Sequence, residues 1–167
     1  SPAAGSLPHF LGVMFGRAAG IEMTHVPYKG TAPALQALAG GEIAAAILLS
    51  ADFNTLVKSG KARALVVSGA ARDPLFPEVP TFREAGYDIE GTGWYALFAP
   101  AGTPMPVLDR LAKAGMAAIR DPGVKQKLTT FGLQPTGHGP AELARIMKAD
   151  YDKWGPVIRA SGWKPGT

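Results

Sequence analysis

The sequence predicts an α/β protein in which helices pack on a largely parallel sheet. Three observations favour this class. Apolar residues make up 47% of the 167 residues and recur along the whole chain, which is typical of a packed core rather than of disorder. Helical and strand-like segments alternate in the first part of the chain, as they do in parallel sheets. The strand-like segments are apolar without interruption, as expected for strands buried on both faces.

In the first part of the chain, the residue pattern predicts three helices, each followed by a strand. Leu7 to Ala19 carries apolar residues at helical spacing after Ser6, which is a good N-cap. Gly40 and Gly41 end the second helix, because glycine favours helix C-termini. In chain order, the expected elements are a helix over 7–19, a strand over 23–27, a helix over 31–39, a strand over 43–49, a helix over 51–59 and a strand over 62–68.

The second part of the chain is expected to be mostly helical. A proline-punctuated loop with one helical turn covers residues 73–86, and the chain then runs extended over residues 87–98. The segment PAGTP at residues 100–104 breaks this extended stretch. Further elements are expected as helices over 106–119 and 123–131, a strand near 133–136 and a long amphipathic helix over 140–161. The chain therefore divides into two blocks, residues 1–92 and residues 93–167.

Charge and composition exclude several classes of function. The net charge of +4 comes from 17 Lys and Arg against 13 Asp and Glu, but the basic residues are scattered singly, so no nucleic-acid partner is expected. The chain has no cysteine, which excludes a disulfide framework and a thiolate metal site. The longest apolar run, residues 43–49, is far shorter than the roughly 20 residues of a membrane helix. The opening SPAAGS has no signal-peptide pattern, so none is expected in this chain.

Metal and enzymatic sites are not indicated by the spacing of reactive residues. His9, His25 and His138 lie far apart without metal-ligand spacing, so neither a metal nor a cofactor is expected. Ser6 lacks a GxSxG elbow. A hydrolase or isomerase that uses Ser6 and His9, which are three positions apart at a helix start, remains one alternative.

Two predicted helices begin in a way that suits an anion. Gly5 and Ser6 precede the first helix, and Gly30 and Thr31 open the second one after a strand. Free backbone N–H groups and the positive end of the helix dipole meet at such positions. A simple structural cap explains each start alone. Because two helix starts at strand ends of one sheet tend to point into the same crevice, the pair favours a binding site for carboxylate or phosphate.

The segment VPYKG, followed by TAPALQALAGGEI, resembles the substrate-binding receptors of tripartite tricarboxylate transporters, the Bug-type receptors. Four further segments match this family in the same order: SPAAGSLPHF, SGKARALVVSGAAR, PEVPTFREAGY and WYALFAPAGTP. The final KWGPVIRASG is similar to the C-terminus of the family. Together these segments cover essentially the whole chain, and their joint order is more specific than any one of them.

The resemblance implies a type II periplasmic-binding-protein fold, with two α/β lobes around a cleft that closes on a small organic acid. Residues 1–92 would form the second α/β lobe, and residues 93–167 would form the hinge crossing and the C-terminal part of the first lobe. The protein would be a receptor without enzymatic activity, located in the periplasm, with a di- or tricarboxylate as ligand and membrane transporter subunits as partners. The ligand-binding residues implied are Ser1, Ala3, Gly5, Ser6, His9, Tyr28, Gly30 and Thr31.

Three departures from the family pattern modify this expectation. Family receptors are longer, and the portion corresponding to their N-terminal half-lobe is missing. The surface left by this portion is expected to expose apolar residues, and a homodimer or strand exchange through it is expected. Ala3 replaces a usual glycine, which would restrict the backbone if that position needs positive φ. Ala44 stands where the family has Asp. An effector-sensing domain of a transcription regulator, which uses a similar two-lobe fold, is the alternative function.

Overall fold

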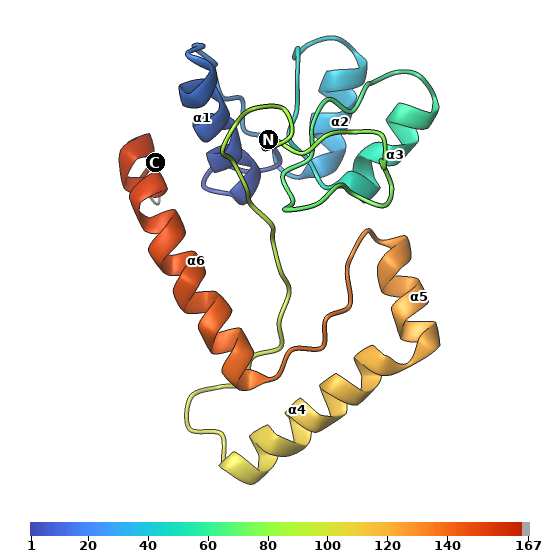
Figure 1. Cartoon of the computed structure of the whole chain (residues 1–167), viewed down its shortest axis with the longest axis vertical. Helices are drawn as coiled ribbons and strands as arrows, with labels where there is room; N and C mark the ends of the chain where they lie inside the picture. The colour runs from blue at the N-terminus through green and yellow to red at the C-terminus, as the bar shows by residue number, and fades with distance from the viewer. Residues whose placement is uncertain (165–167) are drawn as a thin grey trace. The chain divides into compact units, whose positions relative to one another are not determined.

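The computed structural model describes residues 1–164, and these residues contain six helices (Figure 1). They belong to two compact units. Unit 1 comprises Ser1–Gly93 together with the C-terminal segment from Pro156, and unit 2 comprises Trp94–Gly155. The assignment of residues 1–92 and 93–167 to the two lobes of a receptor stays a prediction, and its last residues, 165–167, lie outside the described residues.

Unit 1 contains the helices α1 (Leu7–Ala19), α2 (Thr31–Ala39) and α3 (Ser50–Lys58), and α2 packs on α3. The first two have the predicted bounds, and α3 begins one residue earlier than predicted because the amides of Asp52 and Phe53 donate to the carbonyl of Leu49. Gly20 ends α1 in the left-handed conformation, with φ of 65°, and its N–H donates back to the last turn. The predicted helices are therefore confirmed in this unit.

The core of unit 1 joins α1 and α2 to the long proline-containing loop. Its buried apolar side chains are Phe10, Leu11, Ala34, Ala37, Phe76, Val79, Phe82 and Ile89. The ring of Phe15 on α1 contacts two aromatic rings of the loop. Its centroid lies 5.6 Å from that of Phe82 and 5.2 Å from that of Tyr87. Aromatic pairs at these separations add to the free energy gained from burial. The segment that the sequence predicts as a proline-punctuated loop therefore contributes buried apolar residues to the core of this unit.

Reciprocal hydrogen bonds hold this loop in place. The Thr81 amide donates to the Glu84 carboxylate at 2.8 Å, and the Glu84 amide donates to the Thr81 hydroxyl at 3.1 Å, which is the pattern of a capping box. The Arg72 guanidinium donates to both carboxylate oxygens of Glu84, at 3.1 and 2.9 Å. The backbone hydrogen bond from Thr81, followed by the bond from Arg72, lowers the pKa of Glu84. The one helical turn predicted here corresponds to this box.

The predicted strands are not formed as hydrogen-bonded ladders in the described residues. Over residues 1–164 the pairing recorded is one isolated parallel bridge between Val67 and Thr81. The segments 43–49 and 62–68 are predicted as strands buried on both faces. However, Leu49 in the first segment is 53% exposed to solvent, and Leu65 in the second is 60% exposed. A strand is buried on both faces only when a neighbouring strand pairs with each edge and a layer covers each side. The described chain does not supply these neighbours, so the apolar segments run as irregular chain.

Unit 2 contains α4 (Met105–Arg120), α5 (Pro122–Thr130) and the first part of α6 (Pro140–Ser161), and α4 packs on α5. Asp121 separates α4 from α5 and accepts a hydrogen bond from the Val124 amide at 3.0 Å as the N-cap of α5. The indole N–H of Trp94 donates to the Asp150 carboxylate on α6 at 2.6 Å. The predicted strand near residues 133–136 is not recorded in this part of the described chain.

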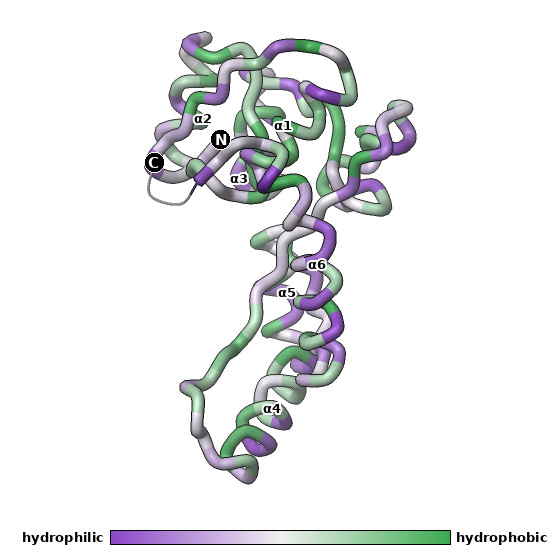
Figure 2. Tube along the Cα trace, turned by 90° about the vertical axis from the view of Figure 1, so that its left-hand side faces the viewer, coloured by the Kyte–Doolittle hydropathy of each residue, from purple (hydrophilic) through white to green (hydrophobic). Residues whose placement is uncertain are grey.

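No residue between 94 and 155 is buried. Hydrophobic and hydrophilic residues alternate along α4 (Figure 2), and many large apolar side chains of unit 2 are exposed. They are Trp94, Tyr95, Leu97, Phe98, Met105, Val107, Leu111, Phe131, Met147 and Tyr151. Unit 2 therefore has amphipathic helices without a core of its own.

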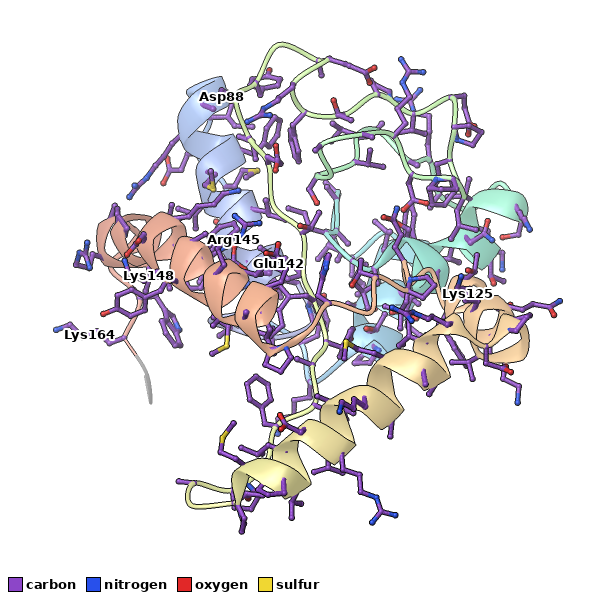
Figure 3. All side chains as sticks on the ribbon, turned by 60° about the horizontal axis from the view of Figure 1, so that its bottom comes forward. Asp88, Lys125, Glu142, Arg145, Lys148 and Lys164 are labelled. Atoms are coloured by element: carbon purple, nitrogen blue, oxygen red, sulfur yellow. The ribbon has the colours of Figure 1, made fainter. Side chains whose placement is uncertain are left out.

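Helix α6 extends for 22 residues and contains Pro156, the residue that follows the end of unit 2. Proline has no N–H to donate to the preceding turn, which weakens the helix at this residue. Exposed ion pairs line the earlier turns, between Glu142 and Arg145 at 2.6 Å (Figure 3) and between Lys148 and Asp152 at 2.5 Å. No helix in the described part of the chain is both long enough and apolar enough to cross a membrane.

Candidate functional site

The two helix starts singled out from the sequence adjoin each other in unit 1. The Tyr28 amide donates to the carbonyl of Ser1 at 3.0 Å, and the Gly30 amide donates to the carbonyl of Pro2 at 2.9 Å. The α-amino group of Ser1 donates to the carbonyl of Val26 at 3.1 Å. Figure 1 shows the N-terminus between α1 and α2. These backbone hydrogen bonds hold the loop before α1 beside the loop before α2.

Neither helix start is capped by its own side chain. Ser6 is the N-cap residue of α1, but its hydroxyl donates to the carbonyl of Ala3 at 2.7 Å and makes no cap bond. Gly30, the N-cap residue of α2, has φ of 108° and no side chain with which to cap. The first N–H groups of a helix have no acceptor within that helix. The amides of Leu7 and Thr31 are therefore donors that an anion can use.

The N–H of Gly5 already has a hydrogen-bond acceptor within the protein. It donates to Nδ1 of His9, in the first turn of α1, at 3.1 Å. Gly5 has φ of 70°, and a Cβ atom at this position would clash with Cζ2 of Trp163. Trp163 also packs edge-on against Phe10, with ring centroids 5.8 Å apart. The loop that precedes α1 therefore lies between His9 and Trp163.

His9 and His25 form a stacked pair, with ring centroids 3.9 Å apart and an interplanar angle of 9°. Nε2 of His25 lies 2.7 Å from the hydroxyl oxygen of Ser1. Burial and then the neighbouring His9 ring lower the pKa of His25 to about 4. Burial also lowers the pKa of His9. Both rings are therefore neutral at neutral pH.

His25 is the residue that sequence reasoning missed. Its spacing from the other histidines indicated no shared site, but the residue directly precedes the VPYKG segment. Its position next to a candidate loop in the sequence was the signal that could have indicated a role for His25. In contrast, the pairing of Ser6 with His9 as nucleophile and base is wrong, because the Ser6 hydroxyl donates to Ala3 and Nδ1 of His9 accepts from Gly5.

The remaining candidate residues lie in or beside the same two loops. Tyr28 is half-buried and Thr31 is the first residue of α2. No non-glycine residue in the described chain has positive φ, so Ala3 adopts an ordinary backbone conformation and its replacement of the family glycine carries no strain. Ala44 is exposed. The structure thus brings Ser1, Ala3, Gly5, Ser6, His9, Tyr28, Gly30 and Thr31 into one region of unit 1.

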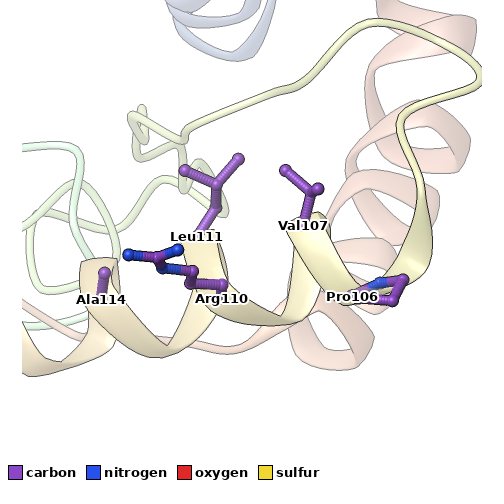
Figure 4. Close-up of a pocket in the computed structure, with 5 residues that line it drawn as sticks. All are labelled: Pro106, Val107, Arg110, Leu111 and Ala114. Atoms are coloured by element: carbon purple, nitrogen blue, oxygen red, sulfur yellow. The ribbon is translucent and has the colours of Figure 1, made fainter.

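The described residues contain no candidate metal cluster, and a further hollow lies on α4. No group of three His, Asp or Glu side chains within residues 1–164 could hold a metal ion. A hollow of about 580 Å³ is lined by Pro106, Val107, Arg110, Leu111 and Ala114. All five residues lie on α4, with Val107 and Leu111 on the same side of the helix (Figure 4). This hollow is the open surface of a single helix.

Solved structures establish the class of protein. The chain superposes on Rpa4515 of R. palustris with adipate at a TM-score of 0.87 and 32% identity, covering 97% of this chain and 55% of that one. It superposes on MatC (Rpa3494) of Rhodopseudomonas palustris with bound malate at a TM-score of 0.80 and 34% identity, covering 92% of this chain and 54% of that one. These structures confirm the predicted α/β class of type II periplasmic binding proteins.

Sequence comparison identifies the family. Residues 1–163 match the family described as tripartite tricarboxylate transporter family receptor. The chain is 34% identical over 162 residues to the UPF0065 protein in the TAR-I ttuE-ttuC' intergenic region of Agrobacterium vitis, covering 95% of this chain and 47% of that protein. The chain belongs to this receptor family, whose members are solute-binding receptors rather than enzymes. It spans about half the length of the relatives named here.

The contact between Gly5 and Trp163 leads to a prediction for stability. We expect Gly5→Ala to lower the free energy of unfolding by about 1–2 kcal/mol through its left-handed backbone and further through displacement of the indole. Gly20→Ala is the matched control, since Gly20 has φ of 65° but a Cβ atom added there would have no other atom within 4 Å. Urea unfolding of both variants measures the difference. Equal losses would show that Trp163 does not constrain the loop.

The histidine pair leads to a prediction for pH dependence. Between pH 6.5 and about 4 the unfolded chain binds a proton at His25 that the folded chain does not, so the free energy of unfolding falls as pH decreases through this window. We expect His25→Gln, whose amide can still pair with the Ser1 hydroxyl, to reduce this slope. His138→Gln, which removes a histidine from unit 2, serves as the control. Urea unfolding at several pH values would contradict the prediction if His25→Gln and the parent chain had the same slope.

Proposed function

We propose that this chain is part of an extracytoplasmic solute-binding receptor that captures a small organic di- or tricarboxylate for a tripartite membrane transporter. The observation that carries this proposal is the junction of two uncapped helix starts by the hydrogen bonds from Tyr28 and Gly30. Two neighbouring clusters of backbone donors suit a ligand with more than one carboxylate. Adipate and malate, bound by the related solved proteins, are both dicarboxylates.

The proposed ligand contacts come from backbone N–H groups and hydroxyls. The loop before α1 offers Ser1, Ala3 and Ser6, and the loop before α2 offers the Tyr28 hydroxyl and Thr31. The amides of Tyr28 and Gly30 are used between the loops, so Gly30 positions the loop rather than contacting the ligand. Gly5 and His9 act indirectly, through their mutual hydrogen bond. Hydrogen bonds to an ionised carboxylate are roughly twice as strong as neutral ones. Binding would therefore depend on the charged form of the ligand.

The setting of the receptor follows from the family. Periplasmic location and membrane transporter subunits as partners are proposed for this chain because it belongs to a transporter receptor family and is similar to the periplasmic binding protein BugD at 30% identity. Closure of two lobes around the ligand would be the signal that the transporter reads. The relatives named above are binding proteins, so the alternative of an effector domain of a regulator gains no support.

Ligand binding is expected to raise the melting temperature. Malate or adipate at a hundredfold excess over its dissociation constant would stabilise the chain by about 2.7 kcal/mol, which corresponds to about 5–10 °C for a chain of this size. Adipamide, which has the same length without charge, is the matched ligand control. Absence of any shift with di- and tricarboxylates at millimolar concentration, both for the chain and for the complete two-lobe protein, would contradict the proposal.

A pair of variants tests the helix start of α1 directly. Leu7→Pro removes one free amide, and proline is tolerated at the first position of a helix. Leu7→Ala retains the amide and removes the side chain. Loss of one hydrogen bond to a charged group is worth about 1.5–3 kcal/mol, so Leu7→Pro should weaken dicarboxylate binding about tenfold or more relative to Leu7→Ala in calorimetry. Equal affinities of the two variants would show that this amide does not contact the ligand.

We also propose that the chain forms a homodimer through the exposed apolar side chains of unit 2, because no residue between 94 and 155 is buried. Leu111, which is 53% exposed on α4, would lie in this interface. We expect Leu111→Asp to shift the dimer to monomer in light scattering, whereas Leu65→Asp, at a residue 60% exposed in unit 1, leaves it unchanged. A parent chain that is monomeric at micromolar concentration would contradict this proposal.

A further inference from the structure

The hydrogen bond from Gly5 to His9 links a titratable ring to the loop before α1. The Gly5 amide donates to Nδ1 of His9 at 3.1 Å, so this nitrogen carries a lone pair and the neutral ring holds its proton on Nε2. A protonated ring has N–H donors at both nitrogens. Protonation of His9 would therefore place two donors against each other and break this hydrogen bond.

The rest of the loop depends on the position of Gly5. Its left-handed backbone turns the chain between Ala3, whose carbonyl accepts from the Ser6 hydroxyl, and the first residue of α1. Trp163 occupies the space that a side chain at Gly5 would need. The loop is thus limited on one side by the indole and is held on the other by the His9 nitrogen. Loss of the His9 acceptor would allow the loop to change conformation.

We propose that His9 is a positioning residue, which holds the Ser1–Ser6 loop in its carboxylate-binding conformation by accepting the Gly5 N–H at Nδ1, and does so only as a neutral imidazole. This inference rests on the proposed function for the nature of the ligand, but its structural part does not require a ligand. Under this proposal His9 does not itself touch the carboxylate. It also makes binding by this loop dependent on pH.

The surroundings of His9 favour the neutral ring. His25 stacks on its face. Burial lowers the pKa of His9 from its ordinary value of 6.5. The ring is therefore neutral and the loop is held at neutral pH.

The first test uses nuclear magnetic resonance without ligand. We expect the ring nitrogens of His9 at pH 7.5 to show a proton on Nε2 and none on Nδ1, and the Gly5 amide resonance to shift with the titration of His9. In His9→Asn this titration should disappear from the Gly5 resonance, whereas His138→Asn should leave it unchanged. A proton on Nδ1, or a Gly5 resonance that does not follow His9, would overturn the proposal whether or not a carboxylate binds.

The second test compares two amide substitutions in dicarboxylate binding. Oδ1 of asparagine is separated from Cα by the same number of bonds as Nδ1 of histidine, so His9→Asn retains an acceptor near the Gly5 amide. The oxygen of His9→Gln is one bond farther away. We expect His9→Asn to keep the affinity for malate or adipate at pH 7.5 and His9→Gln to lose it severalfold. Equal losses in both variants would overturn the proposal, because they would indicate a structural role without the specific acceptor.

The third test compares how the affinity for the dicarboxylate depends on pH in the parent chain and in His9→Asn. We expect the affinity of the parent chain, relative to His9→Asn, to fall as the pH is lowered through the His9 titration that the Gly5 resonance reports, because only the neutral fraction binds. His9→Asn also corrects for titration of the ligand. An affinity that instead rises in acid relative to His9→Asn would show that the imidazolium binds the carboxylate directly. Failure of every chain to bind would refute the proposed function, while the resonance test still decides the role of His9.

Discussion

The candidate site depends on a short set of backbone hydrogen bonds between two segments that are distant in sequence. The amides of Tyr28 and Gly30 donate to the carbonyls of Ser1 and Pro2, and this pairing places the start of α1 beside the start of α2. Each helix start alone would be an ordinary N-terminus. Joined, they offer two sets of uncapped amides, an arrangement that would suit the dicarboxylate proposed as the ligand.

The loop before α1 is shaped by its internal contacts. Gly5 has a left-handed backbone, its N–H is used by His9, and Trp163 lies against the position where a Cβ would be. Because these contacts fix the loop before any ligand arrives, less conformational entropy is lost on binding. The same contacts place a stacked histidine pair beside the proposed anion site, and under the proposal they would let residues that donate nothing to the ligand influence its affinity.

The two units are stabilised differently. Unit 1 buries apolar side chains from α1, α2 and the proline-containing loop, where Thr81, Glu84 and Arg72 form a hydrogen-bonded group. Unit 2 has amphipathic helices but no buried residue between 94 and 155. Apolar surface of this extent normally faces another layer or chain. The receptor relatives named above are about twice as long, and the homodimer proposal addresses the same surface.

The sequence by itself determined the helices, including the bounds of α1, α2 and α6, because caps, glycine stops and apolar periodicity act within a few residues. It also determined the family, through motifs that keep their order along the chain, and it indicated both helix starts of the site. It failed for the strands over 43–49 and 62–68, because a strand exists only when another segment pairs with it. Only the tertiary structure showed that Ser6 does not cap α1, that Gly5 bonds to His9 and that His25 stacks on His9. These contacts join segments through space, and no local pattern of residues encodes which donor meets which acceptor.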